Sequence, residues 1–488
     1  MRNFHRCCIG LACVVLGIVS ARAAHAAPAQ LQVHPFPEAV RYTHHNDDYT
    51  VRVRTPGGPW QDLYEFKVKV DLDNPQTASM VYFNFDGTVE LAIQKNNGDF
   101  SRVAIRPTAK GITPVVRAGI AYVTLDKPEN LSVEFDGDRR HNLHVFTQAI
   151  RTDMPAVAPD LASASIGAGR MPDFTQKTVF FGPGIHRGEF RLRSHSTVYI
   201  HGAAILKNPL ILDGVEDVRV VSDGLFDGAE KTIIRNARNV EIDGPIFINQ
   251  PEGTMRCIAS QDVAERRIRT IGAGQWSDGL GHFACERVTV ADSFIRTSDD
   301  CITFYNHRWD IWGDTRDIKV TGSTLWADVA HAIMIGIHGN TPTPEHPRAE
   351  VLERLRFADI DILDHDEDDP EYAGALGIMA GDDNLVRDVV FEDIRVERIE
   401  EGKLFNFKIA YTAKYNTSPG LGIENITLRN VAYNGVGSPA ASALTGRDAR
   451  RKVRNIVLDN VTVDGKRITG PAPGVLEMNE FVDGVQFR

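Results

Sequence analysis

The sequence predicts an all-β protein, in which an N-terminal antiparallel β-sandwich is followed by a right-handed parallel β-helix. Three observations lead to this fold class. Apolar and polar residues alternate with period two up to about residue 150, and a short strand motif recurs at variable spacing after Phe180. No segment between these motifs has the apolar periodicity of a helix. The length of 488 residues suits two or three ordinary domains or one elongated repeat fold.

Residues 1–26 are predicted to form a secretory signal peptide. Arg2 and Arg6 precede an apolar run, and small residues then lead to a cleavage position after Ala26. Cleavage removes three arginines, so the formal charge moves from -11 to about -14. The acidic charge argues against nucleic acid or an anionic membrane as partner, and no later apolar run is long enough to span a bilayer. We expect a secreted protein, extracellular or periplasmic, and a monomer.

Residues 31–150 are predicted to form the sandwich. Runs such as YTVRVR, MVYFNF and LSVEF alternate with period two, and turns such as Asp86-Gly87 and Asn97-Gly98 separate them at roughly ten-residue spacing. A stretch rich in Ala, Ser, Pro and Gly follows, and we assign residues 151–175 to a linker.

Residues 176–488 are predicted to form the β-helix. Runs such as TVYIHGAAIL, NVEIDGPIFI, RVTVADSFI and NIVLDNVTV mark its coils, whose first apolar residues recur every 20–37 positions. Variable-length repeats made only of short strands are typical of a parallel β-helix, in which insertions loop out from the coils. The alternative, a large sandwich, needs hairpin turns, which are scarce in this region.

The cysteine pattern indicates neither zinc nor a disulfide scaffold. Cys257, Cys285 and Cys301 remain after cleavage, so at most one disulfide can form, between a pair that the sequence does not identify. No CxxC motif or His/Cys spacing suggests a zinc site. We expect no metal and no cofactor.

Three aspartates are the strongest candidates for chemistry. IRTSDDCITFY places Asp299 and Asp300 side by side in what reads as a buried strand, where ionised carboxylates are costly. Asp278, in QWSDGLG, lies 21 residues before Asp299, which is one short coil. Residues one coil apart stack about 4.8 Å apart, so we expect the three acids to cluster, with a bend that turns both neighbours into one cleft. For the pair alone, a turn or a calcium site is the alternative.

Clustered acids of this kind suit inverting glycoside hydrolysis. One protonated acid donates to the leaving oxygen and an ionised acid activates water, with carboxyl groups about 6.5–9.5 Å apart. Mutual repulsion in a partly desolvated groove raises one pKa, which keeps that acid protonated near neutrality. His331 opens a strand of the next coil, and we predict that it tunes the general acid or binds a sugar hydroxyl; a structural histidine is the alternative.

Aromatic and polar side chains near the acids are candidate substrate contacts. Flat aromatic faces stack on sugar rings, and four of the five tryptophans fall between residues 276 and 326. Trp326 is the exception, which we expect to fill the core. The predicted substrate-binding residues are Trp276, Tyr305, Trp309, Trp312, His338, Asn406 and Lys408.

SDGLG, SDDCITFY and HAIMIG together resemble the catalytic coils of the polygalacturonase family, glycoside hydrolase family 28. That family has Asn-Thr-Asp, Asp-Asp, Gly-His-Gly and Arg-Ile-Lys in order. The resemblance implies that Asp299 is the general acid, that Asp278 and Asp300 hold the water, and that His331 assists.

The last element departs from this family. Residues 377–379 read Gly-Ile-Met where Arg-Ile-Lys is expected, and that cation pair binds the galacturonate carboxylate. The departure argues against an acidic substrate. Lys408, one coil further, either replaces the missing cation or is an ordinary surface lysine.

A second resemblance, to the dextranase and isopullulanase family (glycoside hydrolase family 49), covers most of residues 35–340. That family shares the three acids and has a β-sandwich before its β-helix, and VAIRPT, VFFGPGIHRGEF and STLW are similar to its members; His331 is the departure here. The resemblance implies a pectin-lyase-like solenoid that hydrolyses an α-linked polysaccharide, a neutral α-glucan. A polygalacturonase-like hydrolase of pectin is the alternative.

Two other classes stay open. A polysaccharide lyase on the same fold needs calcium and a basic proton abstractor, and a non-catalytic glycan-binding β-helix has no use for clustered aspartates. The acidic run DHDEDDPEY, residues 364–372, is expected to be a solvated loop, with calcium binding as its alternative.

Overall fold

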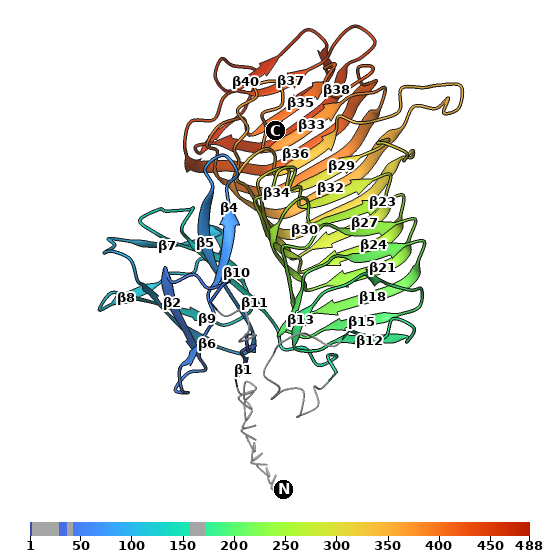
Figure 1. The fold of residues 1–488 in the computed structure, drawn as a ribbon. Coiled ribbons are helices and arrows are strands. Elements are labelled where there is room, and N and C mark those ends of the chain that lie inside the picture. The colour runs from blue at the N-terminus through green and yellow to red at the C-terminus, as the bar shows by residue number, and fades with distance from the viewer. Residues whose placement is uncertain (2–28, 37–41, 156–170) are drawn as a thin grey trace.

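The computed structural model describes residues 1, 29–36, 42–155 and 171–488. Over these ranges the chain is nearly all β, with one 3-10 turn, Thr108–Lys110. The predicted fold class is confirmed: a sandwich lies beside a long parallel β-helix, whose successive coils run from green to red in Figure 1. Most of the predicted signal peptide and of the predicted linker lies outside the described residues.

Two sheets form the sandwich, and their inward side chains make its core. In β2, for example, Val51 and Val53 are fully buried while Arg52 between them is exposed. All strand pairs are antiparallel except β11 with β5, which run parallel. The first sheet contains β1 (Gln30–Gln32), β4 (Phe66–Val70), β5 (Gln76–Asp86), β7 (Val103–Arg106), β10 (Asn130–Phe135) and β11 (Leu143–Gln148). The second contains β2 (Tyr49–Arg54), β3 (Gln61–Asp62), β6 (Val89–Lys95), β8 (Val115–Arg117) and β9 (Ile120–Leu125).

The β-helix has two long sheets, and a typical coil gives two strand segments to the first and one to the second. The first sheet contains β12 (Thr178–Phe181), β13 (Gly184–His186), β15 (Thr197–Ile200), β16 (Ala204–Leu206), β18 (Glu216–Ser222), β19 (Leu225–Asp227), β21 (Arg238–Asp243), β22 (Ile246–Gln250), β24 (Gln261–Arg266), β25 (Arg269–Gly272), β27 (Glu286–Ala291), β28 (Phe294–Thr297), β30 (Thr315–Ala327), β32 (Val351–Asp364), β34 (Leu385–Arg398), β36 (Gly422–Val436), β38 (Val453–Val463), β39 (Lys466–Arg467), β41 (Val482–Asp483) and β42 (Gln486–Phe487). The second contains β14 (Phe190–Arg191), β17 (Leu210–Asp213), β20 (Thr232–Arg235), β23 (Met255–Ile258), β26 (Leu280–Phe283), β29 (Ile302–Tyr305), β31 (Ile333–Gly336), β33 (Leu376–Ala380), β35 (Phe405–Ile409), β37 (Ser442–Thr445) and β40 (Leu476–Met478).

At one equivalent position in each successive coil, the first sheet has a residue with a left-handed backbone, with φ between 53° and 59°. We call this set the left-handed column: His195, Asp217, Asn239, Asp262, Arg287, Asp317, Arg354, Asp388, Asn425 and Asn455. Aspartate and asparagine tolerate this conformation better than most residues, which explains their frequency here. Neighbouring side chains pair along the column, as where the Asn425 amide donates to Asp388 at 2.9 Å.

A buried apolar cluster joins the sandwich to the β-helix. Phe66, Val68 and Phe146 of the sandwich pack against β-helix residues that include Phe294 and Trp326. Trp326 is fully buried, as expected from the sequence. The two parts therefore share one core along this face.

The cysteines lie inside the β-helix. Cys257 and Cys285, on consecutive coils, form a disulfide, and Cys301 is a buried free thiol. The structure thus identifies the disulfide pair that the sequence left open.

Candidate active site

The three aspartates lie at the corners where the chain passes from the first β-helix sheet to the second. Asp278 precedes β26, and Asp299 and Asp300 lie between β28 and β29. The pair lies outside regular strand, at the bend that the sequence led us to expect: the chain bends between Thr297 and Ile302 and releases both side chains from strict alternation.

The corner geometry brings the three carboxyl groups together. One oxygen from each lies within 4.8 Å of the other two. This spacing is shorter than the separation of about 6.5–9.5 Å between the acid and the base that is typical of inverting glycosidases. The carboxyl groups are close enough to share one water or one cation.

Asp300 is held as an acceptor of hydrogen bonds. Its Oδ1 accepts the backbone N–H of His331 at 3.1 Å and contacts His331 Nδ1 at 2.7 Å. Its Oδ2 accepts the Tyr305 hydroxyl at 3.2 Å. Three donors thus fix the position of this buried carboxyl group.

His331 has acceptors at both ring nitrogens. Nδ1 faces Asp300, and Nε2 lies 2.6 Å from the carbonyl oxygen of Tyr372. Only the protonated ring can donate to both, which fits an imidazolium. Burial opposes that charge, but the Asp300 carboxylate outweighs it and raises the pKa of His331 to about 9.

Asp299 and Asp278 have pKa values above the ordinary range. Burial and then the charge of Asp300 raise the pKa of Asp299 to about 7. Burial, followed by Asp299 and Asp300, raises the pKa of Asp278 well above its usual value. The nearest cation is Arg256, whose Nη2 is 3.6 Å from Asp278. The cluster therefore carries fewer than three negative charges near neutrality.

The acids open into a cleft of about 670 Å³. Four of the predicted substrate contacts line it, namely Trp276, Tyr305, Trp309 and His338. Trp276 and Trp309 are 60% and 55% exposed, so their faces are available to a ligand. The cleft thus combines acids with free aromatic surface, the pairing that sugar-binding grooves use.

The other three predicted contacts do not line the cleft. Trp312 is stacked between two histidine rings, with centroids 4.5 Å and 3.9 Å away. Asn406 is buried on β35, and Lys408 forms an ion pair with Glu371. Substrate contact by these three side chains stays a prediction, which the lining of the cleft does not support.

Two arginines in the cleft were not singled out by the sequence. Arg256 on β23 and Arg308 after β29 both line it. Arg308 contacts His338 and lies 4.7 Å from the Trp309 ring centroid. The Arg-Ile-Lys position itself is closed, since a Cβ added at Gly377 would meet His331 Cδ2 at 3.0 Å. Periodicity could have placed Arg256 one coil before Asp278, but nothing marked it as functional.

The acidic run 364–372 is not a simple solvated loop, and that expectation is corrected. Asp364 is fully buried, with its carboxylate 2.8 Å from Arg139 of the sandwich. Glu367, Asp368 and Asp369 line the cleft. The loop closes over the acids because His331 Nε2 bonds its Tyr372 carbonyl.

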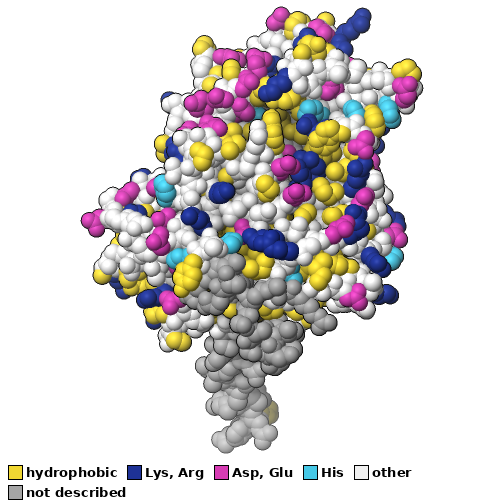
Figure 2. All heavy atoms as spheres, viewed as in Figure 1, with side chains coloured by type: hydrophobic (Ala, Val, Ile, Leu, Met, Phe, Trp, Pro, Cys, Tyr) yellow, Lys and Arg dark blue, Asp and Glu magenta, His cyan; other side chains and the backbone are white. Residues whose placement is uncertain are grey.

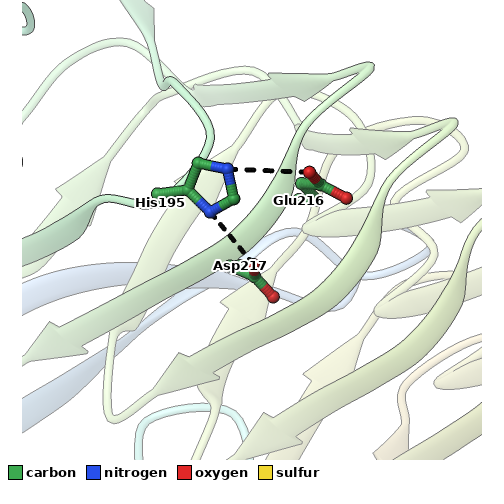
Figure 3. Close-up of side chains that lie close together, drawn as sticks. All are labelled: His195, Glu216 and Asp217. Carbon is green, nitrogen blue, oxygen red and sulfur yellow. Dashed lines mark ion pairs between the residues drawn. The ribbon is translucent and has the colours of Figure 1, made fainter.

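Two groups of side chains among the described residues have metal-ligand spacing. One is the three catalytic candidates; the other is His195, Glu216 and Asp217 (Figure 3). In the second, His195 Nδ1 is 3.0 Å from Asp217, Arg238 pairs with Glu216 at 2.7 Å, and Asn239 donates to Asp217 at 2.6 Å. His195, Asp217 and Asn239 belong to the left-handed column, so their mutual contacts explain this group without an ion.

No described helix is long and apolar enough to cross a membrane. On the face shown in Figure 2, acidic and basic side chains of the described residues are interspersed. Charged side chains of the β-helix also pair between coils, as where Arg354 bonds Asp317 through both Nε and Nη2.

No protein-family model matches the sequence, and no curated protein matches it. In fold the chain is similar to Dex49A from Penicillium minioluteum, with a TM-score of 0.56, 14% identity, and 94% of this chain and 96% of that chain covered. It is also similar to a family 28 exopolygalacturonase from Yersinia enterocolitica, with a TM-score of 0.45, 11% identity and coverages of 86% and 98%. The resemblance to β-helical glycoside hydrolases that the sequence indicated is confirmed at the level of the fold.

Proposed function

We propose that the protein is a glycoside hydrolase that cleaves an α-linked polysaccharide. The observation that carries this proposal is the cluster of Asp278, Asp299 and Asp300 beside His331, in a cleft with two exposed tryptophans. A raised pKa keeps an acid protonated, while an ionised acid stays beside it, as glycoside hydrolysis requires.

In the proposed reaction Asp299 protonates the leaving glycosidic oxygen. Its pKa of about 7 gives it a proton to donate near neutrality. Asp300, with Asp278, holds the attacking water and removes its proton. His331 holds Asp300 in place. We propose inversion at the anomeric carbon; the short spacing between the carboxyl oxygens makes the stereochemistry a necessary measurement.

We propose a neutral α-glucan as the substrate class. The exposed Trp276 and Trp309 provide stacking surface, and the Arg-Ile-Lys position of pectin hydrolases is occupied by Gly377 packed on His331. We further propose that the chain is secreted and acts as a monomer, on the strength of its N-terminal sequence and of a cleft built from one chain.

Pectin-like polyuronate is the second candidate, and one observation favours it. Arg256 and Arg308 reach the cleft from other coils, and Arg308 has no carboxylate partner within ion-pair distance among the described residues. A guanidinium group binds a carboxylate well. These two arginines would then replace the missing cation pair.

The test is release of reducing ends by the mature protein from dextran, pullulan and polygalacturonate, with Asp299→Asn as the inactive control. Release from dextran or pullulan supports the neutral substrate, and Arg308→Ala then has little effect on KM. Release from polygalacturonate, with KM raised by Arg308→Ala, supports the acidic one. Proton NMR of the first product reports inversion or retention.

Two outcomes would overturn the hydrolase. An ultraviolet-absorbing unsaturated product that disappears with EDTA would indicate a lyase. Glycan binding without chain cleavage by either wild type or Asp299→Asn would indicate a binding protein.

A further inference from the structure

The loop between β4 and β5 of the sandwich contacts the corners that carry the acids. Asp71 has a left-handed backbone, with φ of 58°, and it turns two consecutive N–H groups toward the β-helix. The Leu72 N–H donates to Ser298 Oγ at 3.0 Å, and the Asp71 N–H donates to Asp328 Oδ2 at 3.2 Å. Asp71, Ser298 and Asp328 are all buried.

Ser298 links two of the acid-bearing corners. It directly precedes Asp299, and its own N–H donates to Ser277 Oγ at 3.3 Å, while Ser277 directly precedes Asp278. One serine that receives a hydrogen bond from the sandwich therefore adjoins Asp299 directly and is linked to Asp278 through Ser277. A shift of this serine would move the two corners relative to each other.

Asp328 ties the third corner to the same loop. It precedes His331 by three residues, and its N–H donates to the Thr297 carbonyl at 2.8 Å. Arg296 binds both Asp328 oxygens, at 2.7 Å and 2.8 Å, and also donates to Asn142 of the sandwich at 3.0 Å. The sandwich thus contacts all three coils that build the cluster.

We propose that the β4–β5 loop is a positioning element for the carboxylate cluster, acting through Ser298, and that the sandwich is needed for turnover as well as for stability. This inference rests on the proposed hydrolase activity. Carboxyl groups within 4.8 Å of each other repel when ionised, so their separation has to be imposed from outside the cluster. Backbone donors from the sandwich supply such a constraint.

A second contact between the sandwich and the β-helix, remote from the acids, serves as a control. It distinguishes a loop that positions the acids from one that only holds the two parts together. Asn249 accepts the Lys69 N–H at 2.9 Å and donates to the Lys67 carbonyl at 3.2 Å, so it too joins β4 to the β-helix. It lies two coils before the coil of Asp299 and beside none of the acids. Because its φ is 57°, Asn249→Gly removes the contact without backbone strain.

The kinetic experiment compares Ser298→Ala, Ser298→Thr and Asn249→Gly in the full chain. We expect Ser298→Ala to lower kcat about tenfold, to change KM by less than about twofold, and to shift the pH profile of kcat. Ser298→Thr keeps the hydroxyl and regains most of kcat. Asn249→Gly lowers Tm but leaves kcat unchanged below Tm. Equal kcat for all variants, or an equal loss in Asn249→Gly, would overturn the proposal.

Hydrogen exchange tests the same constraint without activity. The Asp300 N–H bonds Asp299 Oδ1 at 2.9 Å, so its protection reports the order of the corner. We expect faster exchange over residues 298–301 in Ser298→Ala only, and over residues 246–250 in Asn249→Gly only. Unchanged exchange at 298–301 would refute positioning even if no polysaccharide were cleaved, whereas an inactive wild type with the expected exchange pattern would refute only the hydrolase.

Discussion

Buried carboxylates at the interface and buried carboxylates in the cleft have opposite surroundings. At the interface, Asp227 contacts His44 at 2.8 Å and pairs with Lys207, while Asp243 pairs with Arg151 and Arg267. Burial raises the pKa of Asp227, but these partners outweigh it and hold the value at about 2. The pKa of Asp243 is likewise lowered, by its two arginines against burial.

The cleft carboxylates meet mainly one another. Asp278 and Asp299 are less buried than Asp227 and Asp243, yet their pKa values are raised, because burial is joined by repulsion from the neighbouring acids. Arg256, 3.6 Å from Asp278, does not outweigh these effects, and Asp299 has no cation within ion-pair distance among the described residues. The charges around each acid, and not its burial alone, therefore distinguish these two pairs of carboxylates.

The largest expected effect distinguishes an acid that transfers a proton from an acid that stabilises the fold. Asp299→Asn removes the proposed general acid, and we expect kcat to fall by about 10³-fold. Because the folded state raises the pKa of this acid, its charge destabilises the fold above the unfolded pKa, so Tm at pH 8 stays equal or rises. Activity assays and calorimetry of the same preparation check both. A large fall in Tm would instead mean that Asp299 stabilises the fold, as the interface acids do.

The pH dependence tests the proton on Asp299 directly. The general acid must be protonated, so kcat/KM is expected to fall about tenfold per pH unit above a pKa near 7. His331, at about 9, stays charged through that limb. The measurement is kcat/KM from pH 5 to 10. An activity that keeps rising to pH 9 would contradict the assignment.

For the interface acids we expect the opposite outcome, a loss of stability without a loss of activity. Asp243→Asn leaves Arg151 and Arg267 short of a carboxylate, and we expect a loss of about 3 kcal/mol in the free energy of unfolding. Activity below Tm stays near wild type. For Asp227, with a folded pKa of about 2, stabilisation is present above about pH 4 and is lost as the pH falls toward 2. Denaturant unfolding at pH 7 and pH 3 measures both effects.

The smallest expected effect tests which tryptophans contact the substrate. Trp309→Ala removes an exposed ring that lines it, and we expect KM to rise about fivefold through lost stacking. Trp312→Ala, outside the cleft, changes KM by less than about twofold. Steady-state kinetics on the identified polysaccharide compares them. Equal effects would mean that the substrate reaches beyond the cleft.

Much of the fold follows from periodicity. Alternation with period two predicted the sandwich strands, and recurrence of β-branched runs predicted the coils, since both patterns record which side chains face the core. The same reasoning brought Asp278 within one coil of Asp299. This prediction depended only on the length of one coil, which can be read from the spacing of the repeated motifs.

Other parts of the site depend on local bends and insertions that periodicity does not record. The corner at Asp299 and Asp300 reads as strand because its flanking residues are apolar on both sides. Arg256 and Arg308 have no distinguishing motif, and the direction of Trp312 is set by stacking on His307 and His346. Contacts between the sandwich and the corners join residues more than 200 positions apart and leave no sequence pattern.

The left-handed column suggests how the coils of such a chain can change in length during evolution. Its members recur after 22 residues near the start and after as many as 37 near the cleft, yet the column keeps its φ, and most of its members pair with a neighbour. Extra residues are thus accommodated elsewhere in each coil without disturbing the stack. Insertions can remodel the walls of the cleft while the acid-bearing corners are inherited unchanged, which gives evolution a way to vary the substrate and retain the chemistry.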